Sequence, residues 1–141
     1  MALFFKFSSL KVYKPYSFIF LMTEEIKRWV LQAQEDLEVA KFLFDGKKYK
    51  QASFFCQQAV EKGLKAVLLK KKRTLIKIHD LVKLAQLVDI DVGYMPDCEK
   101  LTVVYVDTRY PDTLNNIYSQ KETALDLGRA MRILQWVEKN I

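Results

Sequence analysis

Apolar residues recur at steps of three and four along this chain, and this spacing restricts the possible fold more than any other feature. The first such stripe consists of Ile26, Val30, Ala33, Leu37, Ala40 and Phe44. This spacing lines one face of an α-helix, whereas a half-buried strand would alternate strictly. Thr23 is a suitable N-cap, and Asp45-Gly46 is a suitable end with the glycine in a left-handed position. The pattern therefore predicts a first helix over residues 23–45.

A second helix is predicted from about Tyr49 to Lys71, with small side chains along one face. The small residues are Ala52, Cys56, Ala59, Gly63 and Ala66. Such a row lets another helix approach closely, although a glycine costs about 1 kcal/mol of helix propensity relative to alanine. Glu61 and Lys65 on this helix form an i, i+4 pair, which on a helix surface contributes a few tenths of a kcal/mol.

Three shorter patterns follow. Helices are expected at about His79–Val88, Asp97–Val106 and Ser119–Lys139, with residues 89–96 as a loop. Ser119 followed by Glu122 is a capping box at the start of the last helix. The apolar stripe of that helix is expected to be Ala124, Leu127, Met131, Leu134 and Val137. The sequence thus predicts an all-α fold, an antiparallel up-and-down bundle of four to five helices.

The first 21 residues differ from the rest, since they carry three lysines and no acidic residue. Without them the 23 cations become 20 against 17 acids, and the net charge falls from +6 to +3. The apolar run Phe18–Met22 is far shorter than the roughly 20 residues that span a bilayer, and no secretory cleavage site follows it. We expect residues 1–21 to be a leader or extended arm, and Met22 to be the natural start of a domain over 22–141.

The two cysteines, Cys56 and Cys98, lie far apart and have only one histidine with which to share a metal. This pattern predicts no metal site. A buried, reduced thiol at Cys56 is expected, which fits a cytoplasmic protein. No glycine-rich phosphate loop is present, and no cofactor or membrane association is predicted.

Cations gather in the middle of the chain without any acid among them. They are Lys62, Lys65, Lys70, Lys71, Lys72, Arg73 and Lys77. Such a patch attracts polyanions, although a solvated helix face has the same composition. The only histidine, His79, follows directly.

Three separated motifs resemble the HEPN domain family (higher eukaryote and prokaryote nucleotide-binding), in its RYPD-containing prokaryotic branch. They are FCQQAVEK at residues 55–62, HDL at 79–81 and RYPD at 109–112. The resemblance covers about residues 23–141 and implies a helical up-and-down bundle that forms a homodimer. It also implies a separate minimal nucleotidyltransferase as partner, in a toxin–antitoxin or defence pair.

The family's ribonuclease signature is an arginine followed, four to six residues later, by a histidine. Arg73 and His79 have five residues between them, so the resemblance implies that they are the catalytic pair of a metal-independent endoribonuclease. Histidine would move the proton of the 2′-hydroxyl, and arginine would stabilise the phosphorane. Leu81 stands where some members carry a tyrosine that accepts an adenylyl group, which excludes that modification here. Alternatively, His79 only caps the third helix.

Nucleotide or RNA contacts are predicted for a wider set of side chains. They are Lys70, Lys71, Lys72, Lys77, Arg109 and Tyr110. Tyr110 could stack on a base or pack under the turn, and Arg109 could instead pair with Asp107 or Asp112. Gln57 and Gln58 could serve a dimer or a pocket.

Three functions therefore stay open from the sequence. The first is a nucleotide- or RNA-binding module that acts with a separate nucleotidyltransferase. The second is a metal-independent endoribonuclease toxin, and the third is a ligand-free dimeric interaction domain.

Overall fold

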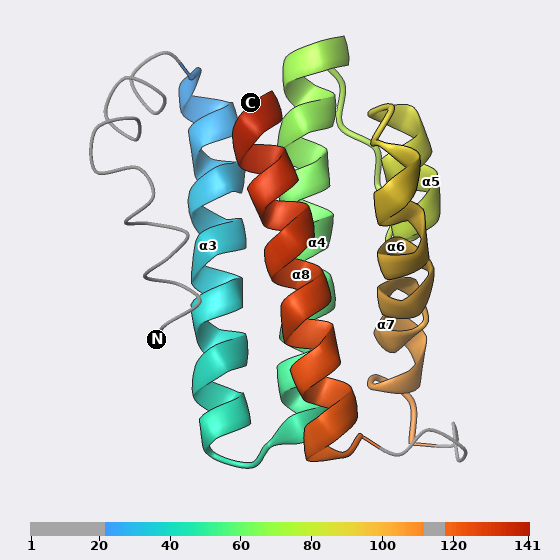
Figure 1. The fold of residues 1–141 in the computed structure, drawn as a ribbon. Coiled ribbons are helices and arrows are strands. Elements are labelled where there is room, and N and C mark those ends of the chain that lie inside the picture. Colours follow the sequence, from blue (N-terminus) through green and yellow to red (C-terminus); the bar gives the residue numbers. More distant parts are fainter. Residues whose placement is uncertain (1–21, 112–117) are drawn as a thin grey trace.

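The computed structural model describes residues 22–111 and 118–141, and every regular element in these two ranges is helical. The elements are α3 (Glu24–Asp45), α4 (Tyr49–Lys72), α5 (Leu81–Leu87), the 3-10 turn η1 (Val92–Tyr94), α6 (Met95–Thr102), α7 (Val104–Asp107) and α8 (Gln120–Asn140). Helices α3 and α4 run in opposite directions, α6 and α7 descend beside α4, and α8 returns (Figure 1). The predicted all-α up-and-down bundle is confirmed. The leader 1–21 and Asp112 lie outside the described residues.

Helix α4 is the centre of the bundle, with α3, α8 and the α5–α7 segment packed around it (Figure 1). Gly63 faces α8 at close range. A Cβ atom at this position would lie 2.7 Å from Leu134 Cδ2 and 3.2 Å from Val137 Cγ2. The small residues predicted to line this face are all buried: Ala52, Cys56, Ala59, Gly63 and Ala66. At Gly63 the expected close helix contact is therefore confirmed, and α8 makes it.

The predicted caps of the two outer long helices are present. Thr23 Oγ1 accepts a hydrogen bond of 3.2 Å from the Ile26 amide, and Ser119 Oγ accepts one of 3.1 Å from the Glu122 amide. The end of α3 differs from expectation. Gly46 has a φ of −83°, and the left-handed residue is Lys47, with a φ of 61°.

Helix α5 begins at Leu81 and not at His79. Its N-cap is Asp80, whose Oδ1 accepts hydrogen bonds from the amides of Val82 (2.9 Å) and Lys83 (3.2 Å). Aspartate is among the best N-cap residues because its carboxylate satisfies the free amides of the first turn. The hypothesis that His79 caps this helix is therefore wrong.

The region after α5 is also more broken than predicted. The expected loop 89–96 contains η1 and the first residues of α6, and the single helix expected over 97–106 is interrupted at Val103. The buried face of α8 also differs from the predicted stripe in the first turns of the helix. Ala124 is exposed there, and Thr123 and Asp126 are buried instead. Ser53 Oγ on α4 explains this, because it lies 3.1 Å from Thr123 Oγ1 and donates a 2.8 Å hydrogen bond to Asp126 Oδ2.

Both cysteines are free and buried, as expected for Cys56. Burial raises the pKa of the Cys56 thiol, and the nearby carboxylate of Asp126 adds to the effect. Burial likewise raises the pKa of Cys98 to about 12. Both thiols are therefore protonated at neutral pH and poor nucleophiles. Within residues 22–111 and 118–141, none of the helices combines the length and apolar character that crossing a membrane requires.

Candidate functional site

The connection between α4 and α5, residues 74–80, contains no helix, and from Leu75 to His79 its side chains turn alternately outward and inward. Ile76 and Ile78 pack against the core, whereas Leu75, Lys77 and His79 are exposed. Alternation of this kind is a property of extended backbone. Lys77 and His79 therefore share the outer side of the connection, with a cation two residues from the imidazole.

The buried carboxylate of Glu61 holds the ring of His79. His79 Nδ1 lies 3.0 Å from Glu61 Oε1 and 3.1 Å from Oε2. The His79 side chain is 49% exposed and that of Glu61 only 7%. An ionised carboxylate only accepts hydrogen bonds, so Nδ1 carries the hydrogen and Nε2 of the neutral ring keeps a lone pair.

Glu61 is in turn fixed by two other side chains of α4. It accepts a 2.8 Å hydrogen bond from Lys65 Nζ and a 3.1 Å hydrogen bond from Gln57 Nε2. The predicted pair of Glu61 and Lys65 is present, but it is buried and is not a surface pair. Gln57 Nε2 also donates to the backbone carbonyl of His79 at 3.2 Å, and Gln58 Nε2 donates to Gln57 Oε1 at 2.8 Å. Gln57 therefore holds both Glu61 and the backbone of His79 in place, and Gln58 orients the amide of Gln57.

An aromatic ring of α7 covers the other side of the histidine. The rings of His79 and Tyr105 are stacked, with centroids 4.2 Å apart and 11° between their planes. The guanidinium carbon of Arg109 lies 4.6 Å from the centroid of the Tyr105 ring, and Arg109 Nη1 donates to the Tyr105 hydroxyl. The structure thus joins two predicted residues, His79 and Arg109, through a tyrosine that sequence reasoning missed. Tyr110 is 51% exposed nearby in sequence.

Arg73 lies at a different part of the molecule. It is the C-cap of α4, with a left-handed φ of 50°, and stands three helical turns beyond Glu61. At 1.5 Å per residue the separation along the helix axis is about 18 Å. Because His79 contacts Glu61, the structure does not bring Arg73 and His79 together within one chain.

The lysines before Arg73 also belong to the far end of the bundle. Lys70 Nζ donates to the carbonyl of Ile141, and Lys71 Nζ donates to the carbonyl of Val88 at 2.6 Å. These carbonyls stand at or just beyond the ends of α8 and α5, where unpaired backbone acceptors attract cations. Lys72 is exposed. Of the predicted lysines, only Lys77 is placed beside His79.

A row of buried polar residues along α4 carries this arrangement. The row is Ser53, Gln57, Glu61 and Lys65, each four positions after the last. The four-residue spacing is a signal in the sequence that sequence reasoning missed for Ser53 and Lys65. In the described part of the chain, no three histidine, cysteine, aspartate or glutamate side chains converge as metal ligands would.

Comparison with known proteins agrees with the helical fold. The family model described as the HEPN domain matches residues 26–140. The crystal structure of TT1696 from Thermus thermophilus is similar, with a TM-score of 0.78 and 26% identity, over 84% of this chain and 100% of that one. The crystal structure of ST0689, described as an archaeal HEPN homologue, has a TM-score of 0.67 and 27% identity, over 84% of this chain and 98% of that one. A search of curated proteins gave no significant match.

Proposed function

This chain belongs to the HEPN domain family, and from that premise we propose that it is a nucleotide- or RNA-binding module whose ligand binds at the His79–Tyr105 site. We define this site as Glu61, Lys77, His79, Tyr105 and Arg109. The observation that carries the proposal is the stack of His79 on Tyr105, with the guanidinium of Arg109 against the same tyrosine. Aromatic, imidazole and guanidinium planes are the groups on which proteins stack unpaired bases.

The charges around the stack support an anionic ligand. Lys77 and Arg109 are exposed and cationic, whereas the one acid of the site, Glu61, is buried and neutralised by Lys65. Phosphate oxygens bind well to guanidinium and ammonium groups, and the guanidinium can do so with two parallel hydrogen bonds. A nucleotide with its base on the rings and its phosphate between the two cations satisfies both sets of groups.

The proposed module acts as a homodimer beside a separate minimal nucleotidyltransferase, in a toxin–antitoxin or defence pair. Exposed apolar side chains next to the site support an interface there. Val103, Val106 and Tyr110 are each at least half exposed on and around α7. Light scattering at micromolar concentration should give twice the monomer mass, and a monomer would contradict the dimer.

A second candidate function is metal-independent RNA cleavage, and the pairing of Glu61 with His79 favours it. The carboxylate orients the ring so that Nε2 could remove the proton of a 2′-hydroxyl. Arg109 lies against the ring on which His79 stacks, whereas Arg73 lies at the far end of α4. In this mechanism Arg109 would stabilise the charge that develops on the phosphorane.

Binding and cleavage can be separated with labelled RNA in the presence of a chelator. We expect salt-dependent binding that is weakened about tenfold or more by Tyr105→Ala, whereas Lys121→Gln on α8 should have no effect. If the protein also cleaves, His79→Ala should abolish cleavage and leave most of the binding. Absence of any salt-dependent binding of RNA or nucleotide would instead leave the ligand-free interaction domain.

A further inference from the structure

A concave surface lies on α3 and α4, apart from the residues of the His79–Tyr105 site. It is a groove of about 320 Å³ lined by Arg28, Trp29, Gln32 and Lys62. Lys62 Nζ is held 2.5 Å from Asp36 Oδ2 and 3.2 Å from Gln58 Oε1. Arg28 and Gln32 are exposed, and the indole of Trp29 is partly exposed. The groove therefore presents an aromatic surface between Arg28 and a lysine whose charge is paired with Asp36.

Lys65 connects this groove to the His79–Tyr105 site. Its Nζ lies 5.8 Å from the ring centroid of Trp29 and 2.8 Å from Glu61 Oε1, and Glu61 binds His79. Glu61 and Lys65 stand two residues on either side of Gly63, which faces α8. At about 100° per residue they point about 160° away from α8. In Figure 1, α8 lies in front of α4. Glu61 and Lys65, which connect the groove and the site, thus lie on the opposite side of α4.

We propose that the Trp29 groove is a second nucleotide subsite, and that a single strand of RNA occupies it together with the His79–Tyr105 site. This inference rests on the proposed function and specifies its substrate class as an oligonucleotide. One base stacks on Tyr105 and His79, and another stacks on the indole of Trp29. Arg28 binds a phosphate at the second subsite.

The presence of two separate ring surfaces supports a strand and not a mononucleotide. A mononucleotide has one base and can stack at only one of the two places. The contacts that join the rings measure 5.8, 2.8, 3.0 and 4.2 Å. The rings cannot be farther apart than this path plus the radius of the imidazole ring. At a rise of about 3.4 Å per stacked nucleotide, a strand of at most about five nucleotides therefore reaches from one ring to the other.

The arrangement also explains why a buried lysine lies between the two places. Lys65, with a side chain 7% exposed, balances the charge of Glu61 and faces the indole. The carboxylate that lies between the two rings, Glu61, is therefore balanced and buried. Aromatic platforms separated by neutral or cationic surface are the arrangement by which proteins hold single strands.

The test compares adenosine monophosphate with hexa-adenylate on the full chain. The chain has two tryptophans, and Trp136 is 5% exposed, so Trp136→Phe leaves Trp29 as the only indole that reports binding. We expect hexa-adenylate to bind about tenfold more tightly than the monophosphate and to quench Trp29 fluorescence. Trp29→Leu, which keeps an apolar side chain against the core, should remove this tenfold gain and leave binding of the monophosphate unchanged.

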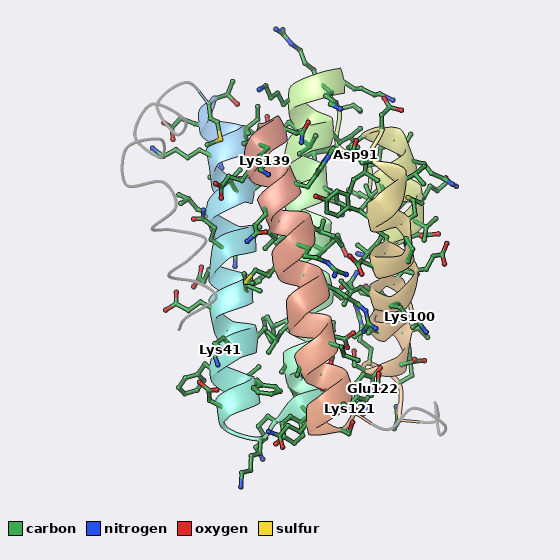
Figure 2. All side chains as sticks on the ribbon, viewed as in Figure 1. Lys41, Asp91, Lys100, Lys121, Glu122 and Lys139 are labelled. Carbon is green, nitrogen blue, oxygen red and sulfur yellow. The ribbon has the colours of Figure 1, made fainter. Side chains whose placement is uncertain are left out.

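A second variant keeps the test valid if Trp29→Leu does not fold. Arg28→Gln changes an exposed side chain and should lower the logarithmic salt slope for hexa-adenylate by about 0.7. Lys121→Gln, at the start of α8 (Figure 2), should not change that slope. Two results would overturn the second subsite and leave the proposed function standing. One is equal affinity for the two ligands without quenching of Trp29, and the other is tighter binding of hexa-adenylate that neither variant reduces. Failure of both ligands to bind would overturn both.

Discussion

His79 lies stacked on Tyr105, 4.2 Å away, while the carboxylate of Glu61 binds its Nδ1. Three elements therefore hold one imidazole: the connection 74–80 carries it, α4 binds its nitrogen and α7 covers its face. None of these contacts is a helix cap or a core packing contact. This is the arrangement expected of a side chain that is positioned for a ligand.

Replacing Glu61 should cost far more stability than replacing His79. Glu61→Gln leaves the buried ammonium of Lys65 without its counter-ion, and removing one member of a buried pair costs about 3 kcal/mol or more. His79→Ala loses one hydrogen bond and one ring stack of a half-exposed side chain, about 1–2 kcal/mol. Urea unfolding of the two variants measures the difference. The double replacement of Glu61 and Lys65 by leucine should recover stability, and equal losses in the single variants would contradict a buried pair.

Lys77 and Lys72 should differ in their contribution to RNA binding, although both are exposed lysines of the same basic stretch. Lys77 lies on the outer side of the connection with His79, whereas Lys72 ends α4 three helical turns from Glu61. Lys77→Gln should reduce the logarithmic salt slope on single-stranded RNA by about 0.7, and Lys72→Gln should leave it unchanged. Equal effects would show that the stretch acts as an undivided patch.

Two helical glycines should respond in opposite directions to alanine. At Gly63 the new Cβ atom would lie 2.7 Å from Leu134 Cδ2, so the cost of overpacking, about 1–3 kcal/mol, should exceed the gain in helix propensity. At Gly128 no atom lies within 4 Å of the new Cβ atom. Gly128→Ala should therefore stabilise the protein by up to about 1 kcal/mol. Thermal unfolding of both variants gives the comparison, and a stabilising Gly63→Ala would show that α8 can move away.

Asp126 should make stability depend on pH. Burial raises the pKa of its carboxyl above the ordinary value, although hydrogen bonds from Ser53 and Arg129 oppose the shift. A carboxyl with a raised pKa in the folded state favours folding most when it is protonated. This contribution is complete below the ordinary pKa of 3.8 and is lost as pH rises through the raised value.

The corresponding measurement uses Asp126→Asn, which cannot ionise. The free energy of unfolding of the wild type, relative to this variant, should be higher at about pH 4 than at about pH 7. Urea unfolding at both pH values gives this difference. A relative stability that rises with pH would show that Arg129 dominates the environment of the carboxyl.

The long helices and their faces could be predicted from the sequence because they depend on local spacing. The row of small residues around Gly63, the caps at Thr23 and Ser119, and the end of α3 at Asp45 all follow from residues a few positions apart. The first turn of α8 could not be predicted in this way. Its orientation depends on Ser53, which is distant in sequence.

The site was only partly predictable for a similar reason. Arg73 and His79 are close in sequence, but an extended connection of about 3.3 Å per residue carries them apart. The same connection brings His79 to Tyr105, which no local pattern indicates. The buried polar row on α4 did have a signal, since Gln57 and Glu61 keep a helical spacing within an apolar helix.

The alternating side chains of residues 74–80 also limit how this connection can change in length. Ile78 faces the core and His79 faces outward, so one inserted residue between them would turn the imidazole away from Glu61. Two inserted residues would restore its direction. Insertions just after Arg73, where the chain leaves α4 in a left-handed bend, would enlarge that bend and leave His79 in place. Relatives that keep this site should therefore vary in loop length just after the arginine. Just before the histidine, their lengths should differ only by even numbers of residues.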